Sequence, residues 1–254
     1  MERKTIVIKL GTNYISNEDR TLNKEVIKAV VSQISSSLGE HNILLVTSGA
    51  VGAGRSIVDE LRYDETTNKQ IFAAVGQVEL MHMYSTLFKA HNQTIAQILA
   101  TKADFSNRDH YLNMKNCLES LMKEKVVPIM NENDVVAIEE LMFTDNDELA
   151  ALISQMISAD MLIIATNVEG VYDDEGNVIS TFEHDSPMPS SIKEGDKSSF
   201  GKGGMMSKFK TAQTAASNGT NVFIVGACKD DFILRLISGE NLGTKFVAKK
   251  IGNK

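Results

Sequence analysis

Short aliphatic runs and longer segments of helical period alternate along the chain. Six runs of mostly β-branched and aliphatic residues are apolar on both faces, at residues 5–10, 43–47, 95–99, 126–130, 161–166 and 222–225. Runs of this kind are typical of the strands of a parallel sheet that is covered on both sides. We therefore expect these six runs to form one buried sheet.

The segments between the runs have the period of an amphipathic helix. In the last of them, Met205, Phe209, Ala212 and Ala216 fall at positions i, i+4, i+7 and i+11, which is one stripe of a helix. The predicted helices cover residues 23–38, 67–90, 107–123, 146–157 and 204–218. This alternation predicts an α/β fold, a three-layer sandwich with a mainly parallel central sheet and helices on both faces.

One stretch, residues 172–203, departs from the alternation. Asp173-Asp-Glu-Gly-Asn177 is a turn signal between two short apolar segments, and it predicts a β-hairpin. The polar residues after it, up to a glycine cluster, are typical of a surface loop. Two interpretations stay open, because such a loop either closes over a ligand as a lid or is a solvated excursion.

Composition narrows the class of protein. The 254 residues carry 26 Lys and Arg against 33 Asp and Glu, and the net charge of −7 argues against a nucleic-acid partner. No apolar run approaches the roughly 18 residues of a membrane span, and the N-terminal apolar stretch is too short for a signal peptide. Cys117 and Cys228 lie far apart, and neither they nor the five histidines form a metal motif. We expect a soluble, cytoplasmic protein without a membrane partner.

Polar and glycine-rich segments follow the predicted strands. They are Lys9-Leu-Gly-Thr12, Thr47-Ser-Gly-Ala-Val-Gly-Ala-Gly54, Asn131-Glu-Asn-Asp134, Thr144-Asp-Asn-Asp147, Thr166-Asn-Val-Glu-Gly170 and Gly201-Lys-Gly-Gly-Met-Met-Ser-Lys208. In open α/β sheets ligands gather beyond the carboxyl ends of the strands, so we expect these segments to converge at one edge. Glycine-rich turns expose backbone N–H groups, and Lys9 and Lys208 add positive charge, a combination that suits phosphoryl transfer. Neither a P-loop nor a GxGxxG fingerprint after the first strand is present.

The same segments resemble a known family. The matching segments are Lys9-Leu-Gly-Thr12, residues 46–55, Lys69-Gln-Ile-Phe-Ala-Ala-Val-Gly-Gln77, residues 128–134, Asp145-Asn-Asp147 and residues 203–208. In this order, from Thr5 to about Phe246, they are similar to the glutamate 5-kinases of the amino acid kinase family. The resemblance implies one amino acid kinase domain over residues 1–254. It implies an amino-acid substrate side at about 1–160, a nucleotide side at about 161–254, and no C-terminal PUA domain.

The resemblance also implies an activity. Such an enzyme transfers the γ-phosphoryl group of ATP to the side-chain carboxylate of L-glutamate, the entry step of proline biosynthesis, which is commonly inhibited by proline. Lys9 and Lys208 would stabilise charge on the transferred phosphoryl group, and Asp147 would orient both lysines. The remaining implied residues are Ser48, Gly49 and Ala50 at the reacting end of the substrate; Asn131, Asp134 and Asn146 at its α-groups; and Thr166, Asn167, Lys202, Gly203, Gly204, Met205, Met206 and Ser207, with both lysines, at ATP. Mg²⁺ would be held largely by phosphate oxygens and water.

Three positions depart from the family pattern. Asn167 stands where well-known members have Asp, Lys202 replaces a Thr, and Met142 replaces a Lys. The first change removes a carboxylate near the nucleotide and the second adds a cation beside the phosphates. These departures bear on nucleotide affinity and base preference, and they leave the implied catalytic groups in place.

Two other functions remain compatible with the sequence. One is a relative that phosphorylates another acceptor, such as aspartate, acetylglutamate or uridylate; the other is a non-catalytic sensor of amino acids or nucleotides. Asp134 favours a substrate with a free ammonium group. Retention of Lys9, Asp147 and Lys208 favours an enzyme, because a sensor does not need to stabilise transition-state charge.

The Leu80-Met-His-Met83 stripe is typical of a core or a subunit interface, so we expect a homo-oligomer, a dimer or a tetramer.

Overall fold

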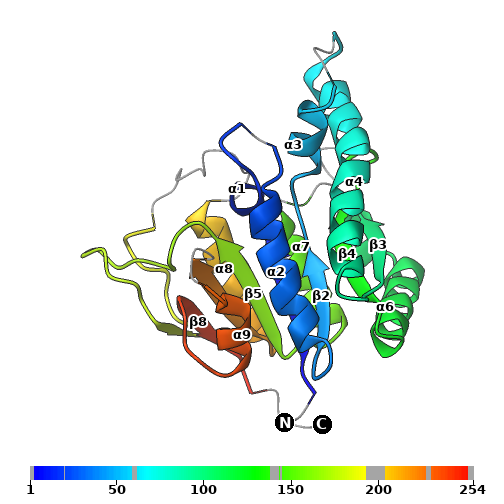
Figure 1. Cartoon of the computed structure of the whole chain (residues 1–254). Helices are drawn as coiled ribbons and strands as arrows, with labels where there is room; N and C mark the ends of the chain where they lie inside the picture. Colours follow the sequence, from blue (N-terminus) through cyan, green and yellow to red (C-terminus); the bar gives the residue numbers. More distant parts are fainter. Residues whose placement is uncertain are drawn as a thin grey trace.

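The computed structural model describes residues 3–19, 21–58, 62–137, 143, 145–192, 204–226 and 230–250. Within these residues the chain forms an eight-stranded sheet in the order β3-β4-β2-β1-β5-β7-β8-β6 (Figure 1). The strands are β1 Thr5–Leu10, β2 Asn42–Val46, β3 Ile95–Ala100, β4 Val127–Glu132, β5 Met161–Thr166, β6 Thr181–Glu183, β7 Asn221–Gly226 and β8 Thr244–Val247. All neighbouring strands are parallel except β7 and β8, which are antiparallel. The predicted α/β class with a mainly parallel sheet is confirmed.

Helices cover both faces of this sheet. They are α1 Thr12–Ile15, α2 Lys24–Ser37, α3 Ala50–Arg55, α4 Glu65–Lys89, α5 Lys102–Ser106, α6 Arg108–Lys123, α7 Asn146–Met156, α8 Met205–Ser217 and α9 Phe232–Ile237. On one face Ile6 and Ile8 of β1 belong to a core with α2, α4 and α9, and on the other face Val7 belongs to a core with α6, α7 and α8 (Figure 1). Successive side chains of a strand point to opposite faces, which explains why these strands are apolar throughout.

The strand β3 differs from the expectation that every strand is covered on both faces. It pairs with β4 alone at the edge of the sheet, and Gln97 and Leu99 are exposed. The sequence signal fails here because an aliphatic run does not distinguish a central strand from an edge strand whose outer face is left uncovered.

Two short strands and several short helices were not predicted. The strands β6 and β8 have three and four residues, and the flanking sequence is not a long apolar run. The turn predicted at 173–177 is confirmed, because Tyr172 and Val178 form an antiparallel bridge closed by the Asp173 N–H and the Asn177 carbonyl oxygen. Residues 193–203 of the loop that follows lie outside the described residues, so the choice between lid and solvated loop is not tested.

Close packing of α3 on α4 positions the loop after β2. A Cβ atom on Gly76 would lie 1.8 Å from the Ala50 carbonyl oxygen, and one on Gly54 would lie 1.9 Å from the Phe72 carbonyl oxygen. These contacts are to backbone atoms, which cannot rotate away as a side chain can. Glycine at these two positions therefore sets the distance between the helices, and α3 begins directly after Ser48 and Gly49.

We expect Gly76→Ala to destabilise the fold by about 1–3 kcal/mol or more, because the added methyl group forces α3 away from α4. Urea unfolding measures the loss, and the KM for the acceptor should rise with it, since the loop after β2 moves with α3. Gly39→Ala is the matched control, because a Cβ there meets nothing within 4 Å. Equal stabilities of the two variants would contradict this packing argument.

Candidate active site

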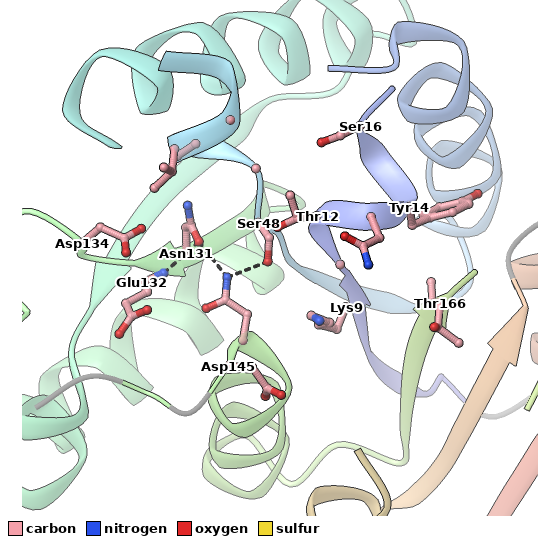
Figure 2. Close-up of a pocket in the computed structure, with 18 of the residues that line it drawn as sticks. Lys9, Thr12, Tyr14, Ser16, Ser48, Asn131, Glu132, Asp134, Asp145 and Thr166 are labelled. Carbon is pink, nitrogen blue, oxygen red and sulfur yellow. Dashed lines mark hydrogen bonds between the residues drawn. The ribbon is translucent and has the colours of Figure 1, made fainter. Parts of the chain in front are cut away.

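A cavity of about 540 Å³ opens at the carboxyl ends of β1, β2, β4 and β5. Lys9, Ser48, Asn131 and Thr166 come from the ends of these four strands or the residues just after them, and all four line the cavity (Figure 2). The predicted convergence of the strand ends on one site is therefore observed. The antiparallel strand β8 and its neighbour β6 contribute no lining residue to this cavity.

A buried carboxylate joins two of the lysines that line this cavity. Lys9 Nζ lies 2.5 Å from Asp147 Oδ1, and Lys208 Nζ lies 2.6 Å from Asp147 Oδ2. Asp147 sits in the first turn of α7 and its side chain is 0% exposed, while Lys208 lies in the first turn of α8. Residues far apart in the sequence thus meet through one carboxylate, while the roles that the family resemblance implied for them remain predictions.

The charges of this cluster control its protonation. Burial by itself would raise the pKa of Asp147, but the positive charges of Lys9 and Lys208 outweigh it and lower the pKa to about 2. Burial opposes the charged form of Lys208 as well, yet its carboxylate partner raises the pKa above the ordinary value. Near neutral pH the aspartate is therefore ionised and Lys208 protonated.

A second aspartate, Asp145, connects the two helices that carry these groups. Its Oδ1 accepts hydrogen bonds from the N–H groups of Asp147 and Glu148, so it caps α7, and its Oδ2 accepts from Ser207 Oγ at 3.0 Å. Burial raises the pKa of Asp145, and the negative charge of Asp147 raises it further. The sequence interpretation gave Asp145 no role, although an Asp just before a helix is an ordinary N-cap signal.

An amide network fixes the substrate side of the cavity. The Nδ2 atom of Asn146 lies 2.7 Å from the Thr47 carbonyl oxygen, 2.8 Å from Ser48 Oγ and 2.9 Å from Asn131 Oδ1. Figure 2 labels Ser48 and Asn131 and draws hydrogen bonds of this network as dashed lines. Asn131 Nδ2 in turn donates to Gln77 Oε1 of α4 at 2.8 Å. Three predicted residues are thereby held by direct hydrogen bonds to one another.

The loop after β2 turns sharply beside this network. Gly49 has φ +96°, a conformation that favours glycine, and it is followed at once by Ala50, the first residue of α3. Both residues line the cavity next to Ser48. The assignment of Ser48, Gly49 and Ala50 to the reacting end of the substrate remains a prediction.

Asp134 lies at the far end of the cavity from Thr166 (Figure 2). Its Oδ1 is 2.8 Å from the Nζ atom of Lys69, a residue of α4 that also lines the cavity. Lys69 belongs to one of the segments that carried the family resemblance, but the sequence interpretation gave it no role. The predicted ammonium-binding carboxylate thus has a cationic neighbour within the protein.

The residues predicted to bind the nucleotide are only partly gathered at the cavity. Four of them line it: Lys9, Thr166, Asn167 and Lys208. Residues 204–207, which are the N-cap and the first three residues of α8, are not among its lining residues. Of these, Gly204 is the N-cap residue of α8, and Ser207 Oγ donates a hydrogen bond to Asp145 Oδ2. Lys202, Gly203 and Met142 lie outside the described residues.

The segment after β1 contributes a wall that sequence reasoning missed. Asn13, Tyr14, Ser16, Asn17 and Glu18 all line the cavity, and Figure 2 labels Tyr14 and Ser16 of this segment. Asn13 Oδ1 and Ser16 Oγ are buried and have no hydrogen-bond partner within the described part of the chain. The signal was weak, because α1 spans only four residues and a short polar stretch reads as an ordinary loop.

Two classes of feature are not found in the described residues. No group of three or more His, Cys, Asp or Glu side chains there is arranged to hold a metal ion. No helix within the same residues combines the length and the apolar character needed to cross a bilayer.

Comparisons with known proteins identify the family of the chain. A family model described as "Amino acid kinase family" matches residues 4–226. The glutamate 5-kinase of Chlorobaculum tepidum is 43% identical in an alignment that covers 97% of this chain and 70% of the relative. The glutamate 5-kinase of Bacteroides thetaiotaomicron is 39% identical over 95% of this chain and 69% of its own. The glutamate 5-kinase of Alkaliphilus metalliredigens is 36% identical over 97% of both chains.

A solved structure supports the fold independently. The UMP kinase from Ureaplasma parvum matches 96% of this chain and 100% of its own with a TM-score of 0.66, at 15% sequence identity. At this identity the likeness concerns the fold alone. The matched family model and the glutamate 5-kinase relatives lead to one conclusion: the chain belongs to the amino acid kinase family, and within it to the glutamate 5-kinases.

Proposed function

We propose that the protein catalyses the ATP-dependent phosphorylation of the γ-carboxylate of L-glutamate to L-glutamyl 5-phosphate, the first step of proline biosynthesis. The observation that carries the proposal is the buried carboxylate of Asp147 between the ammonium groups of Lys9 and Lys208. An aspartate that holds two cations beside a polar cavity suits a reaction in which negative charge moves between phosphate oxygens.

The reaction requires little covalent participation by the protein. An oxygen of the γ-carboxylate attacks the γ-phosphorus of ATP, the bond from that phosphorus to the β–γ bridging oxygen breaks, and ADP leaves with the electron pair. Lys9 and Lys208 stabilise the negative charge on the transferred group and on the leaving oxygen. Asp147 holds both ammonium groups before the substrates arrive, so they need not reorganise during the reaction.

The substrate side of the site fits an amino acid with a free ammonium group. Ser48 and the backbone amides of Gly49 and Ala50 bind the reacting carboxylate. Asp134 binds the α-ammonium group, and Asn131 and Asn146 supply amide groups beside it. A carboxylate and an ammonium in a partly buried cavity form a strong, charge-assisted hydrogen bond.

The nucleotide side takes ATP near the end of β5. The family resemblance assigns Thr166, Asn167 and the run from Lys202 to Lys208 to the ATP site, and of these Thr166, Asn167 and Lys208 line the cavity. Both oxygens of Asp147 are paired with lysines and Asp145 is engaged by N–H groups and Ser207, so the residues fit a Mg²⁺ ion held mainly by ATP oxygens and water. When bound, Mg²⁺ would neutralise phosphate charge.

For Asp134→Ala we expect mainly a raised KM for L-glutamate, by about 10- to 100-fold, because a charge-assisted hydrogen bond to the ammonium is lost. The kcat should change little, since Asp134 contacts the part of the substrate that does not react. Initial rates over a range of glutamate concentrations give both constants. An unaltered KM would show that the α-ammonium group binds elsewhere.

A panel of acceptors tests the proposed function. ADP release is measured with Mg-ATP and L-glutamate, D-glutamate, L-aspartate, N-acetylglutamate or UMP. We expect turnover with L-glutamate far above that with the others. Turnover with another acceptor alone would keep the family and change the substrate. Measurable ATP binding without turnover of any acceptor would instead support a sensor.

We also propose that the chain forms a homo-oligomer, at least a dimer, in the cytoplasm. Val78 of α4, Leu99 of β3 and Val135 after β4 line one shallow hollow, and Val78 is 72% exposed. Exposed apolar side chains that gather in this way are typical of an interaction surface. The molar mass in solution tests the proposal, with Val78→Lys expected to shift it toward the monomer; a monomeric wild-type protein would contradict it.

Feedback by proline is a further proposal that follows from the proposed pathway position. It predicts that proline lowers the rate at limiting glutamate. Full activity at a large excess of proline would refute it.

A further inference from the structure

The ion pair between Lys69 and Asp134 lies inside the cavity, at the end away from the reacting groups. Lys69 Nζ and Asp134 Oδ1 are 2.8 Å apart, and the two side chains are 29% and 13% exposed. Both line the cavity together with Ser48 and Asn131. A surface ion pair would need no functional explanation, but this pair faces the space in which the substrate is proposed to bind.

Contacts from α4 hold this end of the cavity in place. Gln70 Nε2 donates to the Val135 carbonyl oxygen at 2.8 Å, directly beside Asp134 in the chain. Two turns further along α4, Gln77 accepts from Asn131. One helix therefore positions Lys69, the turn that carries Asp134, and the amide network, so the ion pair is part of a fixed wall.

The charges of an α-amino acid head group complement this pair. The ammonium and the carboxylate of such a group are attached to the same carbon, so a ligand whose ammonium contacts Asp134 places its α-carboxylate within a few ångströms of the same aspartate. Lys69 Nζ is the cation found there. Four alternating charges would then lie side by side, and each attraction adds to the others in a partly buried site.

Other cations that line the cavity are less suited to this role. Lys9 and Lys208 are paired with Asp147 at the reacting end. The guanidinium of Arg55 lies over the Phe72 ring, 5.4 Å from its centroid, and Arg55 is exposed. Among the described lining residues, Lys69 is the cation that directly contacts the proposed ammonium-binding carboxylate.

We propose that Lys69 binds the α-carboxylate of the substrate, so that Lys69 and Asp134 together recognise the zwitterionic head group of an α-amino acid. The proposal rests on the proposed function, because it assumes that Asp134 faces the ammonium of L-glutamate. It assigns to Lys69 a role in selecting the substrate and no role in phosphoryl transfer.

Two analogues that each lack one head group separate the contributions. Glutarate lacks the α-ammonium, and 4-aminobutyrate lacks the α-carboxylate. Their inhibition constants against L-glutamate are measured in the wild-type protein and in Lys69→Met and Asp134→Asn, together with the KM for L-glutamate. Competitive inhibition reports binding even where an analogue is not phosphorylated.

For Lys69→Met we expect the KM for L-glutamate and the inhibition constant for glutarate to rise by about tenfold or more, since both ligands lose a charge-assisted contact. The inhibition constant for 4-aminobutyrate should stay within about threefold of its wild-type value, because this ligand has no α-carboxylate. Asp134→Asn should show the opposite selectivity. It should weaken the binding of L-glutamate and 4-aminobutyrate, which carry an ammonium group, and leave the binding of glutarate unchanged. Lys69→Arg should recover part of the loss, because it restores the positive charge.

The alternative roles of Lys69 give different results. If Lys69 only holds Asp134 in position, Lys69→Met weakens the binding of L-glutamate and of 4-aminobutyrate by the same factor, and the proposal is wrong. If Lys69 merely competes with the substrate for Asp134, the variant binds L-glutamate more tightly, which also overturns it. Lys115→Met, which removes an ion-paired lysine from α6, is the matched control and should change none of these constants.

Failure of the proposed function is distinguishable from failure of this inference. A wild-type protein that shows no glutamate-dependent ADP release refutes the function, and the role of Lys69 falls with it. A wild-type protein with normal turnover whose Lys69→Met variant lacks the expected selectivity refutes the inference alone. Thermal unfolding of each variant verifies that the fold is retained.

Discussion

Lys208→Ala should lower kcat by about 10²- to 10³-fold while the KM for L-glutamate changes little. The size is that expected when one preorganised electrostatic group is removed. Lys208 Nζ lies 2.6 Å from Asp147 Oδ2, so a group of the protein itself holds its charge in place. Its contact strengthens as negative charge develops, and a contact of that kind affects kcat rather than glutamate binding.

The matched control for this variant is Lys210→Ala. Lys210 is an exposed lysine two residues further along α8, so its removal changes the charge of the helix without entering the cavity. Steady-state rates over ranges of glutamate and ATP should be close to the wild-type values. An unchanged kcat in Lys208→Ala would remove Lys208 from the catalytic groups, and equal losses in both variants would point to the helix instead.

Asp147→Asn should cost both activity and stability. The substitution leaves two ammonium groups around a neutral amide in a site that is 0% exposed at Asp147. Removing one partner of a buried ion pair typically costs about 3–5 kcal/mol, because the remaining charges are buried without compensation. The kcat should fall at least as far as in Lys208→Ala, because both lysines lose the group that orients them.

The stability loss should depend on pH in a defined direction. Asp147 has its pKa lowered from an ordinary value of 3.8 to about 2, so its ionised form stabilises the folded state at and above about pH 4. This contribution is lost as the pH falls from about 4 toward 2, when the wild-type carboxylate becomes protonated. The difference in unfolding free energy between the wild type and Asp147→Asn should therefore be constant above about pH 5 and shrink below pH 4.

Urea unfolding at several pH values between about 3 and 7 measures this difference. Asp230→Asn is the control, because Asp230 is exposed and its removal should give a small difference at every pH. Two results would contradict the assigned role of the ion pairs. One is that Asp147→Asn lowers the unfolding free energy by less than about 1 kcal/mol at pH 7; the other is that the difference from the wild type is the same at pH 3 as at pH 7.

Much of the fold could be predicted because the central strands are buried on both faces. The predicted runs at 5–10 and 161–166 coincide with β1 and β5, which lie side by side at the centre of the sheet. The edge was harder to predict, since β3 has the same aliphatic composition but is partly exposed. The strand β8 was missed because a run of four residues is too short for an alternating hydrophobic pattern to be recognised.

The candidate site could be predicted where its residues follow strands. Lys9, Ser48, Asn131 and Thr166 lie at strand ends, and the topology alone brings these ends together. The pairing of Lys69 with Asp134 could not be predicted, because it depends on how α4 packs against the turn after β4. Neither could the exact contact of Gly76 with the Ala50 backbone, since a glycine within a helix usually only weakens it.

Isotope transfer from the acceptor to phosphate tests the central claim most directly. L-glutamate labelled with ¹⁸O at both γ-carboxylate oxygens is turned over with Mg-ATP in the presence of hydroxylamine, which converts an acyl phosphate to a hydroxamate. We predict hydroxamate equal in amount to ADP, and one ¹⁸O atom in each phosphate released, because the attacking carboxylate oxygen leaves with the phosphorus. ADP accompanied by unlabelled phosphate and no hydroxamate would mean that water receives the phosphoryl group, and would contradict the account.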